Sequence, residues 1–204
     1  MKNALILVDI QQDFLPGGAL AVPDGDAVVP VANQAMNFFD LVVATQDWHP
    51  ANHRSFAGSH PGRKPGEVIE WKGMTQILWP DHCIQNTPGA AFAKGLNTER
   101  IDKIIFKGTH PDMDSYSGFF DNGHIRKTGL EDFLQKRQIK NITIMGLATD
   151  YCVQFTVLDA CDLGFSVRVL QDGIRGVELK KGDCEKAISR MKDHGAEMIR
   201  IQNL

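Results

Sequence analysis

The chain has 204 residues, of which 43% are hydrophobic and 23% are charged. This balance is typical of a folded globular domain and excludes a disordered chain. The formal net charge is -3, so no basic excess is available to neutralise a phosphate backbone, and nucleic acid is not an expected partner. The longest apolar runs, such as residues 4–8, are too short to cross a bilayer, so no membrane partner is expected.

Short apolar segments alternate with amphipathic segments along the chain. The apolar segments predict strands over residues 4–9, 41–45, 101–106, 142–145, 167–170 and 197–201. The amphipathic segments predict helices over residues 31–39, 128–137, 151–163 and 183–194. Continuous rather than alternating apolarity is typical of strands covered on both faces, so the pattern predicts an α/β fold with a parallel sheet. We expect a single domain over residues 1–204 because no linker interrupts the pattern.

Residues 46–95 break this alternation. The segment is rich in proline, glycine, histidine and tryptophan and shows no clear helix or strand pattern. Loops of this length are uncommon inside a compact domain and are usually functional. We therefore expect a long loop region that binds substrate and metal.

The four cysteines, Cys83, Cys152, Cys161 and Cys184, are irregularly spaced and form no C-x-x-C pair. This spacing argues against a disulfide scaffold and against a structural zinc finger. The first residues also lack the pattern of a secretory signal. We expect a cytoplasmic protein, either a monomer or a homo-oligomer.

Three chemically active side chains stand where predicted strands end. Asp9 ends the first strand, Lys107 ends the third, and Cys152 follows the fourth. Because ligands bind at the carboxyl ends of parallel strands, these side chains are expected to meet there. Thr149 or Asp150 is expected to cap a helix that has Cys152 in its first turn, and the helix terminus and Lys107 are expected to favour the thiolate. Taken singly, each residue also fits a purely structural role, such as a small buried cysteine.

A second group of residues could hold a metal ion. Asp47 and His49 lie two residues apart in an extended segment, so their side chains point the same way, and His82 could be a third ligand. Carboxylate and imidazole ligands suit zinc, iron(II) or manganese. His53 and Ser55 are further candidates in the same region, and surface histidines in a long loop are the alternative.

Aromatic residues accompany both groups. Phe14, Trp79 and Tyr116 fall in segments rich in glycine and proline rather than on helical faces. They could form the walls of a pocket for a flat ring, although ordinary core packing also explains them.

Five segments, in order, carry a family resemblance: ALILVDIQQDFLPGGALAV, VVATQDWHPANHRSFA, LWPDHCIQNTPGA, IFKGTHPDMDSYSGFFDN and MGLATDYCVQFTVLDA. Together they resemble the nicotinamidase/pyrazinamidase branch of the isochorismatase-like hydrolases, over residues 4 to about 175. The resemblance implies a three-layer α/β/α domain with a mainly parallel six-stranded sheet. It also implies an amidohydrolase of linear amides that converts nicotinamide to nicotinate and ammonia through a cysteine thioester, in NAD salvage.

The same resemblance assigns roles to individual residues. It implies a catalytic triad of Asp9, Lys107 and Cys152, and an oxyanion hole formed by the backbone N–H groups of Ala148 and Cys152. It implies a divalent metal ion, with zinc expected first and iron(II) or manganese as alternatives. The implied metal ligands are Asp47, His49 and His82. The implied ring contacts are Phe14, Trp79, Tyr116 and Tyr151, and the family's cis peptide falls at Leu147–Ala148.

Two other functions remain open at this point. A cysteine hydrolase of the same superfamily that acts on an N-carbamoyl or ureido amide would share the triad but would not need the metal ligands. A non-enzymatic protein that binds a metal or another ligand could keep the fold, although it would not need Asp9, Lys107 and Cys152 together. A redox thiol protein is disfavoured because no resolving cysteine lies close in sequence.

Overall fold

A six-stranded sheet forms the centre of the computed structural model, which describes residues 3–204. The strand order is β5-β2-β1-β6-β7-β8, and all five pairings are parallel. The strands are β1 (Asn3–Val8), β2 (Leu41–Asp47), β5 (Lys103–Lys107), β6 (Asn141–Leu147), β7 (Ser166–Arg175) and β8 (Glu197–Ile199). The predicted parallel sheet is confirmed, and each of the six predicted strands is present with shifted ends.

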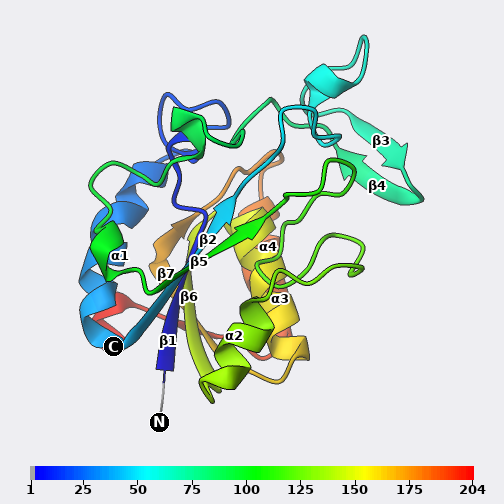
Figure 1. Ribbon diagram of the computed structural model, residues 1–204. Helices are drawn as coiled ribbons and strands as arrows, with labels where there is room; N and C mark the ends of the chain where they lie inside the picture. The colour runs from blue at the N-terminus through cyan, green and yellow to red at the C-terminus, as the bar shows by residue number, and fades with distance from the viewer. Residues whose placement is uncertain (1–2) are drawn as a thin grey trace.

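Helices cover both faces of this sheet. They are α1 (Val28–Ala35), α2 (Leu130–Lys136), α3 (Gln154–Asp162) and α4 (Asp183–Asp193). Figure 1 shows α1 on one side of the sheet and the other three on the opposite side. The strand order explains this arrangement. The connection from β1 to β2 runs toward the β5 edge of the sheet, whereas the connections from β5 through β8 run toward the β8 edge. Because each crossover is right-handed, the two directions place their helices on opposite faces. None of the helices in residues 3–204 combines the length and the apolarity that crossing a membrane requires.

The two covering layers explain the apolar strands. Residues 4–8 of β1 are each at most 1% exposed, because β1 lies in the middle of the sheet with protein on both faces. Burial of this kind contributes roughly 25 cal/mol per Å² of apolar surface. A strand buried on both sides therefore has no polar face, which is the pattern seen in the sequence.

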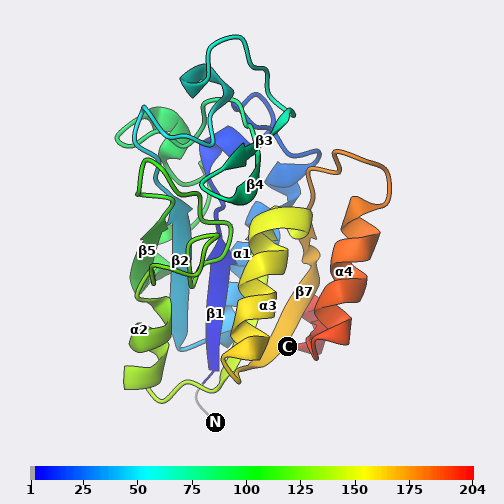
Figure 2. The same ribbon diagram turned by 90° about the vertical axis from the view of Figure 1, so that its right-hand side faces the viewer.

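The order of the strands creates a site at one edge of the sheet. From β1 the chain builds the sheet outward on one side through β2 and β5, and then on the other side through β6, β7 and β8. The strand order therefore reverses between β1 and β6, which pair from Asn3↔Asn141 to Val8↔Gly146. The segments that follow these two strands must separate there, and ligands of open α/β sheets bind in the resulting crevice. Figure 2 shows the strands running toward the end of the molecule where the long loops gather.

The structure corrects the predicted start of the third helix. Residues Thr149–Val153 form a π-helical turn, and the α-helix begins only at Gln154. Neither Thr149 nor Asp150 caps this helix, so the predicted cap is wrong. The Asp150 carboxylate instead accepts hydrogen bonds from the backbone N–H groups of Val177 and Glu178, which offer two donors at once.

A β-hairpin corrects the expectation that residues 46–95 lack regular structure. Strands β3 (Val68–Trp71) and β4 (Met74–Ile77) pair antiparallel in a small separate sheet, which projects from the loop end of the molecule in Figure 1. Lys72 and Gly73 form the two-residue turn, and both have positive φ angles, of 50° and 78°. Hairpin turns of this kind usually carry asparagine or aspartate before the glycine. Because lysine stands there instead, the sequence gives only a weak indication of a hairpin.

We predict that Gly146→Ala disrupts the β1–β6 pairing. Gly146 has φ +126°, and a Cβ atom there would overlap the backbone of Val8. The expected loss of unfolding free energy is about 3 kcal/mol or more, measured by urea denaturation. The control Gly195→Ala also has a positive φ but meets no atom within 4 Å, so it should lose only about 1–2 kcal/mol. Equal losses in the two variants would contradict this account.

Candidate active site

The carboxyl edge of the sheet brings together Asp9, Lys107 and Cys152. The Lys107 ammonium nitrogen lies 2.9 Å from Asp9 Oδ2 and 3.4 Å from the Cys152 sulfur. All three residues are buried, with relative exposures of 0%, 2% and 7%. The sequence predicted these residues from three separate strand ends, and the structure places them in one contact cluster.

Neighbouring groups hold Asp9 and Lys107 in place. Asp9 follows β1 and has a φ angle of 48°. The Thr45 hydroxyl accepts a hydrogen bond from the Asp9 N–H at 3.2 Å and donates one to Asp9 Oδ1 at 2.7 Å. The Lys107 ammonium also donates to Asp47 Oδ1 and to the Ser115 carbonyl, both at 2.8 Å. Thr45 and Ser115 were missed by the sequence analysis, because no motif marks a residue that acts through one hydroxyl or one carbonyl.

Burial and charge set the protonation of the cluster. Burial lowers the pKa of Lys107, but the Asp47 and Asp9 carboxylates more than offset this effect, so its pKa lies well above the usual value and the ammonium stays charged. Burial raises the pKa of Asp9, and Lys107 opposes this only in part. Asp9 is therefore a carboxylate that is ready to accept a proton.

The surroundings of Cys152 act on the pKa of its thiol in opposite directions. Burial raises the pKa of the Cys152 thiol well above its usual value, Lys107 lowers it, and Asp9 and Asp47 raise it further. The π-helical turn runs directly into α3, so Cys152 lies in the first turn of this continuous helical segment. Activation therefore requires a direct transfer of the thiol proton to Asp9, which forms a hydrogen bond with the thiol.

Asp47, His49 and His82 converge beside this cluster. The Nδ1 atoms of His49 and His82 face the carbonyl oxygens of Gly108 at 2.9 Å and Pro80 at 2.7 Å. A carbonyl only accepts, so each Nδ1 carries a proton and each Nε2 is the ring nitrogen left to bind a cation. These Nε2 atoms lie 3.3 Å and 3.8 Å from Asp47 Oδ2.

This donor set fits a divalent cation. Ligand atoms of the three residues lie within 4.8 Å of one another, and the buried His49 Nε2 has no hydrogen-bond partner. Three acceptors that face one another need a cation between them, and an imidazole fixed through Nδ1 to a carbonyl is the usual arrangement of a metal ligand. Gly108 is required here because a Cβ atom at this position would overlap the His49 ring.

Asp47 connects the metal ligands to the cysteine cluster. Its Oδ1 accepts from Lys107, while its Oδ2 faces the two histidines. Gln11 fixes its backbone, because the Gln11 amide donates to the Asp47 carbonyl and accepts from the Asp47 N–H, both at 2.8 Å. Displacing Asp47 would thus disturb both groups of residues.

His53 and Ser55 contact each other. The Ser55 hydroxyl lies 2.7 Å from His53 Nδ1, and His53 Nε2 faces the Met113 carbonyl at 3.4 Å. Burial and the neighbouring His49 lower the pKa of His53 to about 4, so its ring is neutral. In this arrangement both ring nitrogens of His53 have polar neighbours, and one of them also lies within 4.8 Å of ligand atoms of His49 and Asp114.

A narrow slot runs between the metal-ligand group and the thiol. It is lined by Phe14, Leu20, Asp47, Trp79, His82, Asp114, Tyr116, Ala148, Tyr151, Cys152 and Val177. The Trp79 indole donates to the Tyr116 hydroxyl at 3.1 Å, and Tyr151 packs edge-on against the Trp79 ring. The Leu147–Ala148 peptide bond is cis.

All four aromatic residues named from the sequence line this slot, and so do Ala148 and Cys152. Leu20, Asp114 and Val177 were missed. They come from loops without a distinctive motif, so only their position in space identifies them.

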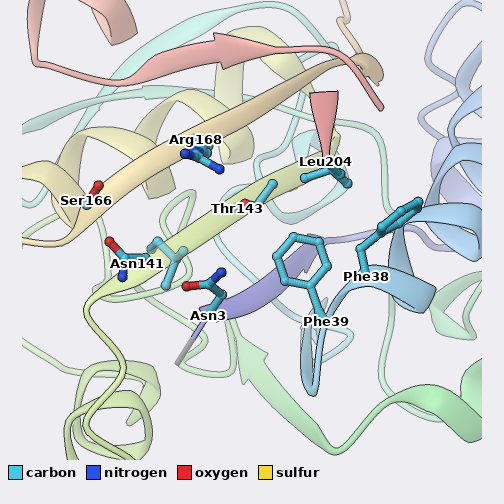
Figure 3. Close-up of a pocket in the computed structure, with 9 residues that line it drawn as sticks. Asn3, Phe38, Phe39, Asn141, Thr143, Ser166, Arg168 and Leu204 are labelled. Carbon is cyan, nitrogen blue, oxygen red and sulfur yellow. The ribbon is translucent and has the colours of Figure 1, made fainter. Parts of the chain in front are cut away.

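A larger cavity, of about 320 Å³, lies at the opposite edge of the sheet (Figure 3). It is lined by Asn3, Phe38, Phe39, Asn141, Ile142, Thr143, Ser166, Arg168 and Leu204. No cysteine, histidine, aspartate or glutamate is among these lining residues. The nucleophile and the metal-binding side chains therefore identify the narrower slot as the candidate active site.

Known proteins resemble the whole chain. A family model described as the isochorismatase domain matches residues 3–203. The nicotinamidase of Escherichia coli strain K12 is 49% identical over 203 residues, which cover 98% of this chain and 95% of that protein.

Solved structures agree with this comparison. An Acinetobacter baumannii nicotinamidase/pyrazinamidase has a TM-score of 0.96 at 44% identity, covering 99% of this chain and 97% of that one. A Pyrococcus horikoshii pyrazinamidase in complex with zinc has a TM-score of 0.79 at 40% identity, covering 98% and 99%.

We predict that Lys107→Met strongly destabilises the fold. The change leaves two buried carboxylates, Asp9 and Asp47, without their cation, so the expected loss of unfolding free energy is about 3–5 kcal/mol. The control Lys72→Met removes an exposed ion pair with Asp112 and should cost far less, because water screens an exposed pair. Urea denaturation of both variants measures the difference, and similar losses would show that the buried ammonium does not hold the site together.

Proposed function

Because this chain belongs to the isochorismatase family, we propose that it is a nicotinamidase, which hydrolyses nicotinamide to nicotinate and ammonia. The observation that carries the proposal is the contact between Asp9, Lys107 and Cys152 beside a slot that is also lined by Asp47 and His82 of the metal-ligand group. The 49% identity to a nicotinamidase over almost the full length supports the same substrate.

The slot fits a flat heteroaromatic amide. Trp79, Tyr116, Tyr151 and Phe14 supply aromatic walls, and aromatic rings pack favourably against a pyridine ring. Asp47, His49 and His82 would hold one divalent ion, for which zinc is our first choice. When bound, this ion would act as a Lewis acid toward the nitrogen of the substrate ring. Cys152 lines the same slot, so its thiol can reach the carboxamide group.

The first half of the reaction forms a thioester. Asp9 takes the proton of the Cys152 thiol, and the sulfur attacks the carboxamide carbon. The backbone N–H groups of Ala148 and Cys152 stabilise the negative charge on the carboxamide oxygen, a contribution usually worth 10²- to 10³-fold in rate. Asp9 then returns its proton to the amide nitrogen, the carbon–nitrogen bond breaks, and ammonia leaves.

The second half releases the acid. Asp9, again a carboxylate, takes a proton from water, and the resulting hydroxide attacks the thioester carbon. The carbon–sulfur bond breaks, the sulfur takes the proton back from Asp9, and nicotinic acid leaves and gives its own proton to water, which yields nicotinate. Throughout both halves, the Lys107 ammonium neutralises the charge that moves between Asp9 and the sulfur.

The metal-ligand set distinguishes this function from hydrolysis of an N-carbamoyl or ureido amide. Hydrolysis of such an amide would need the triad, but the substrate has no ring nitrogen that a metal ion could bind. The fixed Nε2 atoms of His49 and His82 facing Asp47 favour a substrate that uses a cation. The chain also keeps Asp9, Lys107 and Cys152 together in one buried cluster, which a protein that only binds a ligand does not require.

The proposal extends to the setting of the reaction. All four cysteines are free thiols, which suits a reducing compartment. Together with the family membership, this supports a role in recovering the pyridine ring for NAD synthesis in the cytoplasm.

Turnover of nicotinamide tests the proposed function directly. We expect the purified protein to release ammonia and nicotinate, and Cys152→Ala to lose at least about 10³-fold in kcat while still binding nicotinamide. Cys161→Ala is the matched control, because Cys161 lies on α3 and outside the slot, and it should retain near-normal turnover. Near-normal turnover by Cys152→Ala would eliminate the thioester route.

Metal content provides a second, independent measurement. We expect one tightly bound divalent ion per chain, and His82→Ala should lower its affinity at least about 10-fold in competition with a chelator. His194→Ala changes an exposed histidine of the α4 terminus and should leave the affinity unchanged. Equal affinities in both variants would remove His82 from the ligand set.

A further inference from the structure

Asp150 connects the turn that carries the nucleophile to the segment after β7. It stands two residues before Cys152, yet its carboxylate bonds to another part of the chain. Its Oδ1 accepts from the Val177 N–H at 2.9 Å, and its Oδ2 accepts from the Glu178 N–H at 2.8 Å. Asp150 is only 8% exposed, and hydrogen bonds to a buried carboxylate are about twice as strong as neutral ones.

Close packing holds the same segment from its other side. A Cβ atom at Gly176 would overlap the Cys184 sulfur and would lie 3.0 Å from Asp150 Oδ1. Only glycine therefore fits where the chain leaves β7 and passes between α4 and Asp150. Residues 176–178 are thus fixed by two hydrogen bonds on one side and by packing on the other.

Val177 is the residue of this segment that reaches the slot. It lines the slot together with Ala148 and Cys152. The strand register pairs Leu147 with Arg175, so Ala148 and Gly176 follow the two strands side by side at the carboxyl edge. The Val177 N–H bonds to Asp150, two residues before Cys152, so Val177 lies beside the turn that carries the thiol.

We propose that Val177 selects primary carboxamides by closing the slot beside the leaving nitrogen, and that Asp150 is the positioning residue that holds Val177 there. The inference rests on the proposed function and adds a specificity determinant to it. A primary amide presents only NH₂ at this position, whereas an amide methylated on nitrogen must place its methyl group against the valine side chain.

The size of the effect follows from hydrophobic packing. One methyl group that a pocket must accept or reject usually changes kcat/KM by about 10- to 200-fold. Removing the two methyl groups of Val177 should therefore permit N-methylnicotinamide, methylated on its amide nitrogen. The discrimination is the kcat/KM for nicotinamide divided by that for N-methylnicotinamide.

We expect Val177→Ala to lower this discrimination at least about 10-fold, chiefly through better turnover of N-methylnicotinamide. Val31→Ala is the matched control, since Val31 is a partly buried valine of α1 outside the slot, and its discrimination should equal that of the wild type. An unchanged discrimination in Val177→Ala would overturn the proposal.

Asp150→Asn tests the positioning role. An amide side chain offers only one acceptor oxygen and turns its NH₂ toward one of the two N–H groups, so the segment loosens. We expect the discrimination to fall about 3- to 10-fold, while Asp162→Asn, an exposed aspartate on α3, should change nothing. In the double variant with Val177→Ala, Asp150→Asn should add almost no further loss, because it acts through the same side chain. Additive losses, or a fall in kcat for both substrates with unchanged discrimination, would contradict positioning through Val177.

The outcomes separate this inference from the proposed function. If the wild type does not hydrolyse nicotinamide, the proposed function fails, whereas an active enzyme with unaltered discrimination in the variants overturns only the inference. Dissociation constants of the two amides on a Cys152→Ala background give the same comparison without turnover. If Asp150→Asn does not fold, the discrimination measured for Val177→Ala alone confirms or overturns the role of Val177.

Discussion

The site depends on one buried ammonium group, that of Lys107, which contacts Asp9, Asp47 and the Cys152 sulfur at once. Two carboxylates could not stay ionised in such a buried place without a cation between them. The same contact joins two groups of residues, because Asp9 lies beside the thiol and Asp47 faces the two histidines. In the proposed mechanism, a single side chain therefore fixes the position of the thiol relative to the metal-ligand group.

The parallel sheet brings these side chains together without a rearrangement of the backbone. Asp9, Asp47 and Lys107 stand at or just beyond the carboxyl ends of β1, β2 and β5, three strands that are adjacent in the sheet. Their backbone positions are fixed by the ladder of hydrogen bonds below them, so the side chains are preorganised rather than ordered by substrate. The β6 edge supplies the remaining groups through the cis peptide bond and the π-helical turn that carries Cys152.

Loops complete the slot, and they are tied to the same framework. The hairpin of β3 and β4 reaches the segment before Tyr116, because the Trp71 indole donates to the Asp112 carbonyl at 2.9 Å. On the other side, Asp150 ties the segment after β7 to the turn that carries the thiol. These side-chain contacts give irregular segments a defined position that their own backbone pattern does not provide.

Residues with a strong chemical identity could be named from the sequence alone. Aspartate, lysine, cysteine and the two histidines stand beside apolar runs or in short motifs, and the strand-end rule predicts that Asp9, Lys107 and Cys152 meet. Residues that act through ordinary groups could not be named. Thr45, Gln11 and Val177 contribute a hydroxyl, an amide and two methyl groups, and such groups occur throughout any chain.

The sequence by itself determined the α/β class, the six strands and the kind of chemistry, because these follow from local apolar patterns and from residue types. Only the tertiary structure decided the surroundings that raise the pKa of Cys152, the bonding of His53 to Ser55 and the partner of Asp150. Burial, opposing charges and competing donors set these properties, and each depends on groups that lie far apart in the chain and meet only when it folds.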